Sequence, residues 1–381
     1  MRLATHLVWL ELRRAPSRML RPAVTLTVIA ALAMVLAALV DTLDRRSTGV
    51  LRAVEADLVM FNVEARQQVL RSRIPRPATI GAGFVDGVFE IGVLSVVPTT
   101  VTHQGELQRA TLVGFNARTP AEPVRILQGR VPTDGEPNLA AIDAALHRTG
   151  IEVGDRITLG GSLDVEVVGV VAEAMFLQQP TVWVPPEVWA RTGARAFPER
   201  GYAEAIVGIG LVQVKIDADP AEVAPEIVAE MAEEDLDVEV VPLRAAVAAV
   251  PGVSAIRATF GGLVALAIGV VVLVSAGLAL LQVDQDRARG AELRAMGAGP
   301  GVLSGMLLLR LAVTWAVAST AGAVLAAALA AAVPAAVPLA ARPVTLVSVA
   351  ALLAVAVAAG GAVALRRTRN IDPAEALGGQ W

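Results

Sequence analysis

The side chains best suited to specific chemistry gather in one short stretch, "DQDRARGAELRAMGAGPG", at residues 284–301. Arginines and acidic residues are mixed within it, and glycines and a proline end the segment. Arginine and glutamate form charge-assisted hydrogen bonds that fix the register of a protein contact, while leucine and methionine can anchor it. Two of the most apolar runs of the chain flank this stretch, so its role depends on the elements that hold it.

Catalytic constellations are scarce in the rest of the sequence. His6, His103 and His147 are scattered and lack the spacing of metal ligands. There is no cysteine and no Gly-x-Ser-x-Gly motif. The only lysine, Lys215, stands in "QVKID" rather than in a phosphate-binding Gly-Lys-Ser/Thr loop. We therefore expect no catalytic residue, no metal site and no cofactor of this chain's own; if ATP drives it, another polypeptide must bind the ATP and magnesium.

Two further groups of side chains have both a functional and a structural interpretation. The first is an acidic cluster made of Glu230, Glu233, Glu234, Asp235 and Asp237. It could bind a cation, but a solvated helix end is the better interpretation. The second is an aromatic group made of Phe176, Trp183 and Trp189. It could form a hydrophobic lip for a ligand, but a core strand that enters a helix explains it better.

The composition indicates a membrane protein. Of 381 residues, 55% are hydrophobic and only 18% are charged, whereas soluble domains are usually about 25% charged. The net charge of −4 gives no reason to expect nucleic-acid binding. Crossing the hydrocarbon core takes roughly 20 apolar residues, and four segments are long enough. These predicted spans are residues 22–41, 258–283, 311–332 and 344–365.

Arginines near the ends of the spans predict the orientation in the cell membrane, because cytoplasmic loops carry an excess of them. They precede the first span, lie between the second and third, and follow the fourth: Arg13, Arg14, Arg18, Arg21, Arg287, Arg289, Arg294, Arg366, Arg367 and Arg369. Both termini and the loop at 284–310 are therefore expected in the cytoplasm. Residues 42–257 are expected outside it.

The flanks of the spans complete this layout. The first apolar run is longer than a signal peptide needs, so we expect it to remain as a span. Residues 1–21 are expected as an interfacial helix, or equally as an ordinary extension of the first span, and residues 366–381 as a cytoplasmic tail. Starting the third span at Leu311 leaves Arg310 at the cytoplasmic interface, where its charge is tolerated.

Small residues on the second span predict a close contact with another helix. Gly261, Ala265, Gly269 and Gly277 share one helical face, at four-residue spacing or its double. Small side chains there let a second backbone approach. The alternative is chance, in a chain this rich in glycine and alanine.

Residues 42–257 predict a folded α+β domain inserted between the first and second spans. Residues 150–171 predict two strands joined by a turn at Gly160–Gly161. Residues 212–242 predict a strand, an amphipathic helix and another strand. The flanks, 43–55 and 243–257, have helical composition and are expected to form a stalk. The predicted fold class is thus four transmembrane helices plus an extracytoplasmic α+β domain.

Three segments resemble a known family, the MacB/FtsX-like (type VII) permeases of ABC transporters. "ELRAMGAGPGVL" (292–303) resembles the "LRALGA" segment after the family's second span, and "RNIDPAEALGG" (369–379) resembles its tail. Residues 126–171 resemble its outer-domain pattern of Gly-Arg, then Val-Gly-Asp, then a strand ending in Val-Gly. The three segments occur in the family's order, and the resemblance covers essentially the whole chain.

The resemblance implies that the charged stretch is a coupling helix that docks on the ATP-binding subunit. The residues expected in this contact are Arg287, Arg289, Glu292, Leu293, Arg294, Met296 and Gly297. A second contact would come from the tail residues Asp372, Pro373, Glu375 and Leu377. The alternatives are a plain positively charged loop and a disordered tail. The sequence departs from the family at Arg289, where many members have glutamate, and at Arg310, where many have an acidic residue early in the third span.

The resemblance also implies a function. The chain would be a non-catalytic permease that couples ATP hydrolysis, in two copies of a separate ATP-binding subunit, to movement of its outer domain. It would pair with a second copy or a paralogue in the lipid membrane. By this mechanotransmission it would export or extract a lipid, lipoprotein, peptide or drug, with an extracytoplasmic lipoprotein, adaptor or hydrolase as a further partner. One alternative is an FtsX-like regulator that activates an extracytoplasmic partner such as a cell-wall hydrolase; another is an autonomous membrane enzyme or adhesin.

Overall fold

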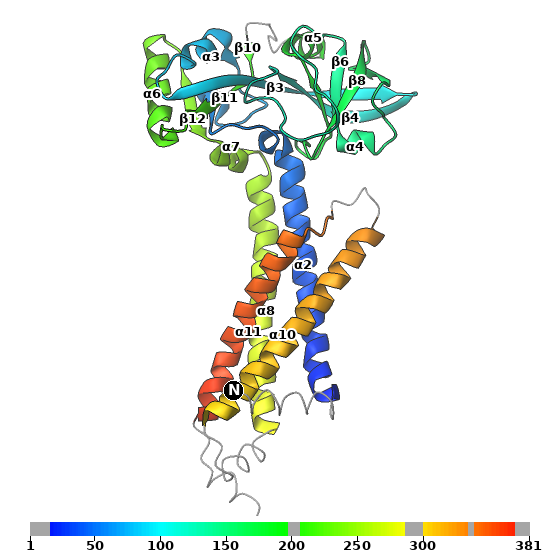
Figure 1. Ribbon diagram of the computed structural model, residues 1–381, viewed down its shortest axis with the longest axis vertical. Helices are drawn as coiled ribbons and strands as arrows, with labels where there is room; N and C mark the ends of the chain where they lie inside the picture. The colour runs from blue at the N-terminus through cyan, green and yellow to red at the C-terminus, as the bar shows by residue number, and fades with distance from the viewer. Residues whose placement is uncertain (1–15, 197–205, 286–299, 334–338, 370–381) are drawn as a thin grey trace, which may run out of the picture. The chain divides into compact units, whose positions relative to one another are not determined.

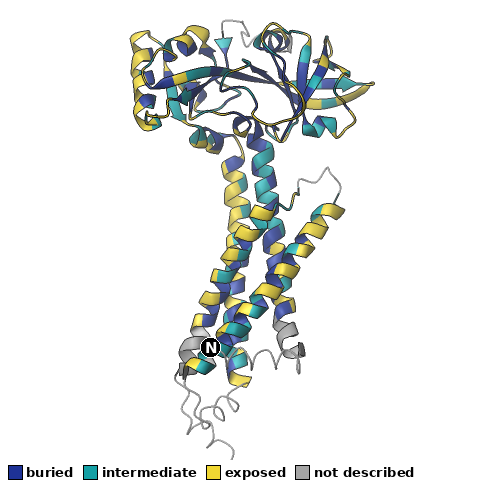
Figure 2. Ribbon diagram, in the orientation of Figure 1, coloured by how far each residue is buried: buried dark blue, intermediate teal, exposed yellow. Residues whose placement is uncertain are grey.

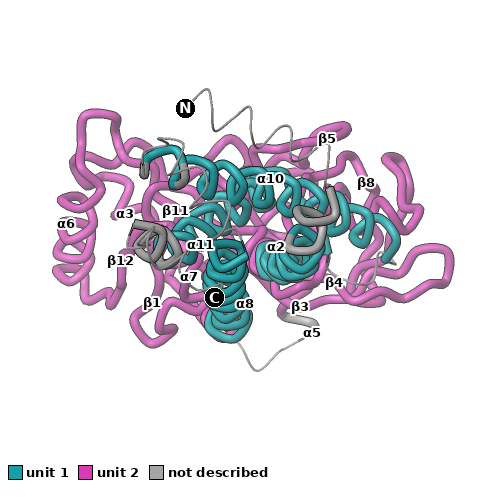
Figure 3. The backbone as a smooth tube through the Cα atoms, turned by 90° about the horizontal axis from the view of Figure 1, so that it is seen from below, with its two compact units in different colours: residues 1–42, 256–381 teal, residues 43–255 magenta. Residues whose placement is uncertain are grey.

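The computed structural model describes residues 16–196, 206–285, 300–333 and 339–369. The chain divides into two compact units (Figure 3). A membrane unit comprises residues 1–42 and 256–381, and an outer unit comprises residues 43–255. The outer unit is therefore an insertion in the membrane unit, as the sequence predicts.

Four helices are long and apolar enough to cross a membrane: α2 (Pro16–Arg52), α8 (Val253–Gln285), α10 (Pro300–Ala332) and α11 (Pro343–Arg369) (Figure 1). Each contains one of the predicted spans. Apolar residues occur on all faces of these helices, and large ones such as Leu266 and Leu273 of α8 are exposed (Figure 2). Helices that are apolar all round suit a lipid environment or contact with further helices.

The third of these helices extends ahead of its predicted span. The sequence predicts a coupling-helix loop at residues 284–310 and a span from Leu311; in the structure α8 continues to Gln285 and α10 begins at Pro300. Proline is well suited to the first turn of a helix, because its missing N–H has no partner to lose there. No further proline interrupts residues 301–310. Arg310 therefore lies within α10 rather than ahead of it.

Small residues allow close packing inside the membrane unit. A Cβ added to Gly360 of α11 would lie 2.6 Å from the carbonyl oxygen of Val272 on α8. One added to Gly322 of α10 would lie 3.1 Å from a backbone nitrogen of α2. The indole Nε1 of Trp315 on α10 donates a hydrogen bond to the carbonyl oxygen of Ala350 on α11 at 3.0 Å. The four helices thus share one core of mostly alanine, valine and leucine.

A mixed sheet of 10 strands dominates the outer unit, in the order β12-β1-β11-β3-β4-β9-β6-β8-β5, with β7 paired to β3 and β8. The strands are β1 (Leu58–Asn62), β3 (Val88–His103), β4 (Glu106–Phe115), β5 (Ile126–Gly129), β6 (Leu139–Asp143), β7 (Arg156–Leu159), β8 (Leu163–Val171), β9 (Thr181–Val184), β11 (Ile209–Val214) and β12 (Val238–Pro242). Two short strands, β2 (Ile74–Pro75) and β10 (Ile206–Val207), pair separately. Most are rich in valine and isoleucine, which favour the extended backbone.

Short helices cover the sheet. They are the 3-10 turn η1 (Val63–Ala65) and the helices α3 (Arg76–Ala82), α4 (Ala144–His147), α5 (Pro186–Ala196), α6 (Pro220–Glu233) and α7 (Leu243–Ala249). α3 and α6 pack against each other near one end of the sheet, and α5 packs on β3 and β4 (Figure 1).

The strand β3 joins the two halves of the sheet. Its first part pairs with β11, and its second part, from Leu94 to His103, pairs with β4. A separate apolar core lies in each half, and a third lies near the end of α2. In that third core the rings of Phe115 and Trp183 meet edge to face, with centroids 5.5 Å apart. One long strand thus ties together two packed regions of the outer unit.

The structure contains the local elements that the sequence predicts at residues 150–171 and 212–242. The predicted helical stalk at 243–257 is instead interrupted, because α7 ends at Ala249 and α8 begins at Val253. β7 and β8 form a hairpin whose turn, Gly160–Gly161, has φ values of +55° and +70°. Glycine adopts this left-handed conformation without strain. β11, α6 and β12 follow one another across residues 209–242, and α6 is capped by Asp219, whose carboxylate accepts a hydrogen bond from the N–H of Ala221 at 2.8 Å.

Candidate functional site

The residues predicted to contact an ATP-binding subunit lie outside the described residues. This holds for the coupling-helix residues Arg287, Arg289, Glu292, Leu293, Arg294, Met296 and Gly297. It also holds for the tail residues Asp372, Pro373, Glu375 and Leu377. Both assignments stay predictions.

The small-residue face of α8 is exposed within this chain. A Cβ added to Gly261, Gly269 or Gly277 would have no atom of the described chain within 4 Å, and Ala265 is exposed as well. The described residues do not supply the close helix contact predicted for this face, and that contact stays a prediction. Gly360, which does pack closely on α8, was not predicted as a contact residue, although it stands in "AAGGAV" within the fourth span.

The aromatic group and the acidic cluster agree with their structural interpretations. Phe176, Trp183 and Trp189 are all buried, so they do not form an exposed lip. Trp189 nevertheless lines the pocket described below. The acidic residues Glu230, Glu233, Glu234, Asp235 and Asp237 are exposed at the end of α6, as a solvated helix end would be.

Polar contacts join α2 to the start of α11 and to the residues just before it, within the membrane unit. The hydroxyl of Thr345 donates to a carboxylate oxygen of Asp41 at 3.3 Å, and Arg342 approaches the same oxygen at 3.9 Å. The N–H of Ala340 donates to the hydroxyl of Thr42 at 3.1 Å. An acidic side chain near the end of a transmembrane segment is tolerated when such partners face it.

The C-terminal end of α2 is fixed by residues 173–179, which connect β8 to β9. Three backbone hydrogen bonds cross between them: Leu177 N–H to Ser47 O at 3.2 Å, Gln178 N–H to Arg46 O at 2.9 Å and Val50 N–H to Met175 O at 3.2 Å. We call residues 173–179 the clamp segment. Glu173, Leu177 and Gln178 have positive φ values there, a conformation that side chains other than glycine rarely adopt.

Gly49 makes this approach possible. A Cβ at this position would lie 2.5 Å from the carbonyl oxygens of both Glu173 and Met175. Any other residue would therefore push the clamp segment away from α2. The buried carboxylate of Asp143 supports the clamp segment from the other side, since it accepts a hydrogen bond from the N–H of Ala174 at 2.8 Å. Burial raises the pKa of Asp143, and its two backbone N–H donors partly oppose that rise.

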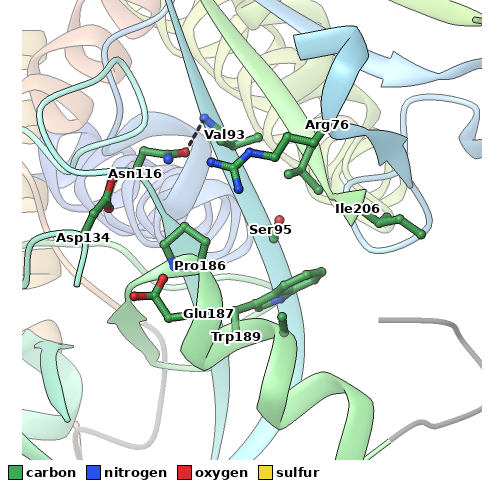
Figure 4. A pocket seen from close by; sticks show the side chains of 12 residues that line it. Arg76, Val93, Ser95, Asn116, Asp134, Pro186, Glu187, Trp189 and Ile206 are labelled. Atoms are coloured by element: carbon green, nitrogen blue, oxygen red, sulfur yellow. Dashed lines mark hydrogen bonds between the residues drawn. The ribbon is translucent and has the colours of Figure 1, made fainter. Parts of the chain in front are cut away.

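A pocket of about 350 Å³ lies in the outer unit, between α5 on one side and α3 and β10 on the other (Figure 4). Its lining combines apolar residues with charged and amide side chains. The polar and large aromatic side chains in the lining are Arg76, Ser95, Asn116, Asp134, Glu187 and Trp189. Gly114 of β4 also lines the pocket. A Cβ at this position would lie 2.5 Å from the Cβ of Trp189, so glycine allows Trp189 to approach the strand. The size is at the lower end of the range for small-molecule sites, roughly 300–1,000 Å³.

An exposed ion pair stabilises the loop that carries one of these lining residues. The guanidinium of Arg130 makes two hydrogen bonds to the carboxylate of Glu136, at 2.7 and 2.8 Å. The N–H and the hydroxyl of Thr133 each donate to the same carboxylate at 2.8 Å. Arg130 first, and Thr133 second, lower the pKa of Glu136 to about 2. Asp134, which lines the pocket, lies inside this loop.

Comparisons with known proteins find related architecture only among solved structures. No protein-family model matches the sequence, and no curated protein matches it. The chain is similar to the periplasmic region of MacB from Actinobacillus actinomycetemcomitans, with 12% identity, a TM-score of 0.41, and coverage of 51% of this chain and 92% of that one. It is also similar to the extracellular domain of the ABC-type transporter YknZ from Gram-positive bacteria, with 18% identity, a TM-score of 0.37, and coverage of 48% and 98%.

Proposed function

We propose that the chain is the permease subunit of an ABC transporter of the MacB/FtsX-like type, and that a separate ATP-binding subunit supplies ATP hydrolysis. The chain resembles these permeases in the order of its parts: one apolar helix, a large inserted α/β unit, and three more apolar helices. The sequence segments at 126–171, 292–303 and 369–379 support the same assignment. Because Lys215, the only lysine, stands outside any phosphate-binding loop, another chain has to bind the ATP.

One observation supports mechanotransmission above the others: α2 is a single helix that belongs to both units. It runs without interruption from Pro16 to Arg52, while the boundary between the units falls at Thr42 and Leu43. A helix transmits displacement along its axis because its backbone hydrogen bonds form a continuous ladder. The clamp segment and Gly49 hold the end of this helix firmly in the outer unit. A shift of the membrane part of α2 would therefore move the outer unit.

The contacts of Asp41 and Thr42 couple α2 to α11. They join α2 to Ala340 and Arg342, just before α11, and to Thr345 in its first turn. A change in the packing of the later helices would reach α2 through these bonds. In the proposed orientation the arginine-rich ends of the helices face the cytoplasm and the ATP-binding subunits, and the outer unit faces away. Two permease chains would act together on a lipid, lipoprotein, peptide or drug at the outer side.

The test is co-purification. The tagged full-length chain is extracted from its own cells in mild detergent, and the eluate is assayed for ATP hydrolysis. We expect a second polypeptide with a phosphate-binding loop and ATPase activity. The double variant Arg294→Glu, Met296→Ala should lose this partner, because it removes one charge contact and the apolar anchor of the predicted coupling helix. Arg109→Glu, on the exposed end of β4, is the matched control and should retain it.

Two outcomes would contradict the proposal. One is a chain that purifies without any ATPase in several detergents. The other is an ATPase that stays bound to the double variant as firmly as to the unaltered chain. An ATPase that co-purifies but responds only to an extracytoplasmic hydrolase would instead support the FtsX-like alternative.

A further inference from the structure

The pocket of the outer unit has charged groups on opposite walls. In Figure 4, Arg76 reaches into it from the start of α3, while Asp134 and Glu187 stand on the far side, in the loop after β5 and in α5. Asn116, at the end of β4, lies between them, and Trp189 forms part of the wall beside Glu187. These residues come from four separate parts of the chain.

The donors on the Arg76 side are available for a ligand. Among the described residues, the guanidinium of Arg76 makes no hydrogen bond and no ion pair. The side-chain oxygen of Asn116 accepts a hydrogen bond from the N–H of Val93 at 3.2 Å, which fixes the orientation of the amide. Its NH₂ group then has no partner in the described part of the chain. A guanidinium and an amide NH₂ together make a site for a carboxylate.

The acceptors on the opposite wall are only half used. One oxygen of Asp134 accepts a hydrogen bond from the N–H of Ala117 at 3.3 Å. One oxygen of Glu187 accepts a hydrogen bond from the N–H of Gly135 at 3.3 Å. In each carboxylate the second oxygen has no hydrogen-bond partner among the described residues. Two such oxygens suit an ammonium group, which carries three donors.

Apart from Ser95, the rest of the lining is apolar. Val93, Ile206 and the ring of Trp189 contribute to it. Apolar walls exclude water and so strengthen interactions between opposite charges. A ligand that carried only one charge would leave the opposite wall facing an unpaired group, which lowers affinity.

We propose that this pocket binds a small zwitterion of dipeptide size, with its carboxylate on Arg76 and Asn116 and its ammonium on Asp134 and Glu187. The volume of about 350 Å³ favours a ligand of this size over a folded partner or a lipid tail. The inference does not depend on an ATP-binding subunit. It concerns this chain alone, so its failure would leave the proposed permease function untouched.

The experiment uses the purified full-length chain in detergent and three probes: glycyl-leucine, N-acetyl-glycyl-leucine and glycyl-leucine amide. Binding is followed by calorimetry and by tryptophan fluorescence, to which Trp189 contributes. Glycyl-leucine should bind saturably. Each capped probe lacks one charge and should bind at least about tenfold more weakly.

Variants test which pocket residues bind the carboxylate of the ligand and which bind its ammonium group. Arg76→Gln should bind the free dipeptide and its amide equally, because the carboxylate has lost its partner. The double variant Asp134→Asn, Glu187→Gln should bind the free and acetylated dipeptides equally. Arg109→Gln and Glu106→Gln, exposed on β4 and absent from the lining, are the matched controls and should behave as the unaltered chain does.

Three results would overturn the inference. They are the absence of saturable binding by any probe, equal binding of all three probes, and variants that weaken the probes without changing the preference among them. Arg76 is exposed, and its guanidinium has no hydrogen-bond or ion-pair partner among the described residues, so Arg76→Gln should fold normally, and its melting temperature verifies this.

Discussion

Glu136 receives hydrogen bonds from both Arg130 and Thr133, and these donors favour its charged form. Its pKa falls from 4.5 to about 2. A carboxylate with a lowered pKa contributes stability above its unfolded pKa and loses that contribution as the pH falls toward its folded pKa. The ion pair therefore stabilises the folded outer unit at neutral pH, and this effect disappears between about pH 4.5 and 2.

Glu136→Gln tests this linkage. At pH 7 we expect a small fall in melting temperature, about 1–2 °C, because exposed ion pairs contribute little. The difference from the unaltered chain should shrink as the pH is lowered from 5 to about 2. Thermal unfolding at several pH values measures it. A difference that stays constant over this range would show that charge is not the cause.

The pocket shows which information the sequence alone does not provide, namely which side chains face the same cavity. Trp189 was recognisable as an aromatic residue near Trp183 and Phe176, but the sequence does not tell which of the three faces a cavity. Arg76, Asn116 and Glu187 are ordinary surface residues in sequence terms. Only the pairing of β3 with β4, and the position of α5 across them, brings their side chains around one cavity.

The junction between α2 and the clamp segment depends on the absence of one side chain. In an ordinary helix, Gly→Ala stabilises by roughly 1 kcal/mol. At Gly49 the new Cβ would meet two carbonyl oxygens at 2.5 Å. We therefore expect Gly49→Ala to destabilise the outer unit by about 1–3 kcal/mol, the range for overpacked sites. The sign of the effect is thus opposite to that at an exposed helical glycine.

Hydrogen exchange and thermal unfolding check this prediction. Gly49→Ala should speed the exchange of the Leu177 and Gln178 amides, whose hydrogen bonds to α2 it disrupts. Gly262→Ala is the matched control, because a Cβ there meets nothing within 4 Å. If the outer unit of Gly49→Ala keeps its stability and its amide protection, Gly49 is not required for the contact between α2 and the clamp segment.

Local elements are predictable where turn and helix-capping residues mark their ends in the sequence. The hairpin of β7 and β8 follows from two glycines between valine-rich runs, and α6 follows from Asp219 and Pro220 ahead of an amphipathic pattern. The clamp segment has no such signal. Its positive φ values fall on Glu173, Leu177 and Gln178, residues that do not usually mark that conformation, because tertiary contacts impose it. Arg310 marks the predicted start of the third span, but it carries no signal for the start of α10, which Pro300 provides.

For the molecule as a whole, the small-residue face of α8 is the surface at which we predict that two copies of the chain pair. Gly269→Leu should leave the fold and stability of the single chain unchanged, since a Cβ there meets nothing within 4 Å. It should weaken the pairing of two permease chains by about tenfold if their helices approach at this face. Single-molecule photobleaching of labelled protein in lipid nanodiscs counts the copies.

Ala327→Leu provides the comparison, because the same side chain is added at an exposed position of another membrane helix, α10. Pairing that is equally strong in both variants would locate the contact elsewhere on the membrane unit. Pairing that both variants weaken equally would point to a general effect on the membrane helices rather than to this face.

The two ends of the outer unit meet inside it. β1 follows α2 and β12 precedes α7, and these strands pair from Leu58 with Pro242 to Asn62 with Val238. The N–H of Leu243 also donates to the carbonyl oxygen of Asp57 at 2.9 Å. A gene encoding such a chain could lose the whole insertion, or exchange it for another with adjacent ends, in one recombination event that keeps the order of the membrane helices. A new outer unit can then be acquired by a single replacement, while the membrane helices stay the same.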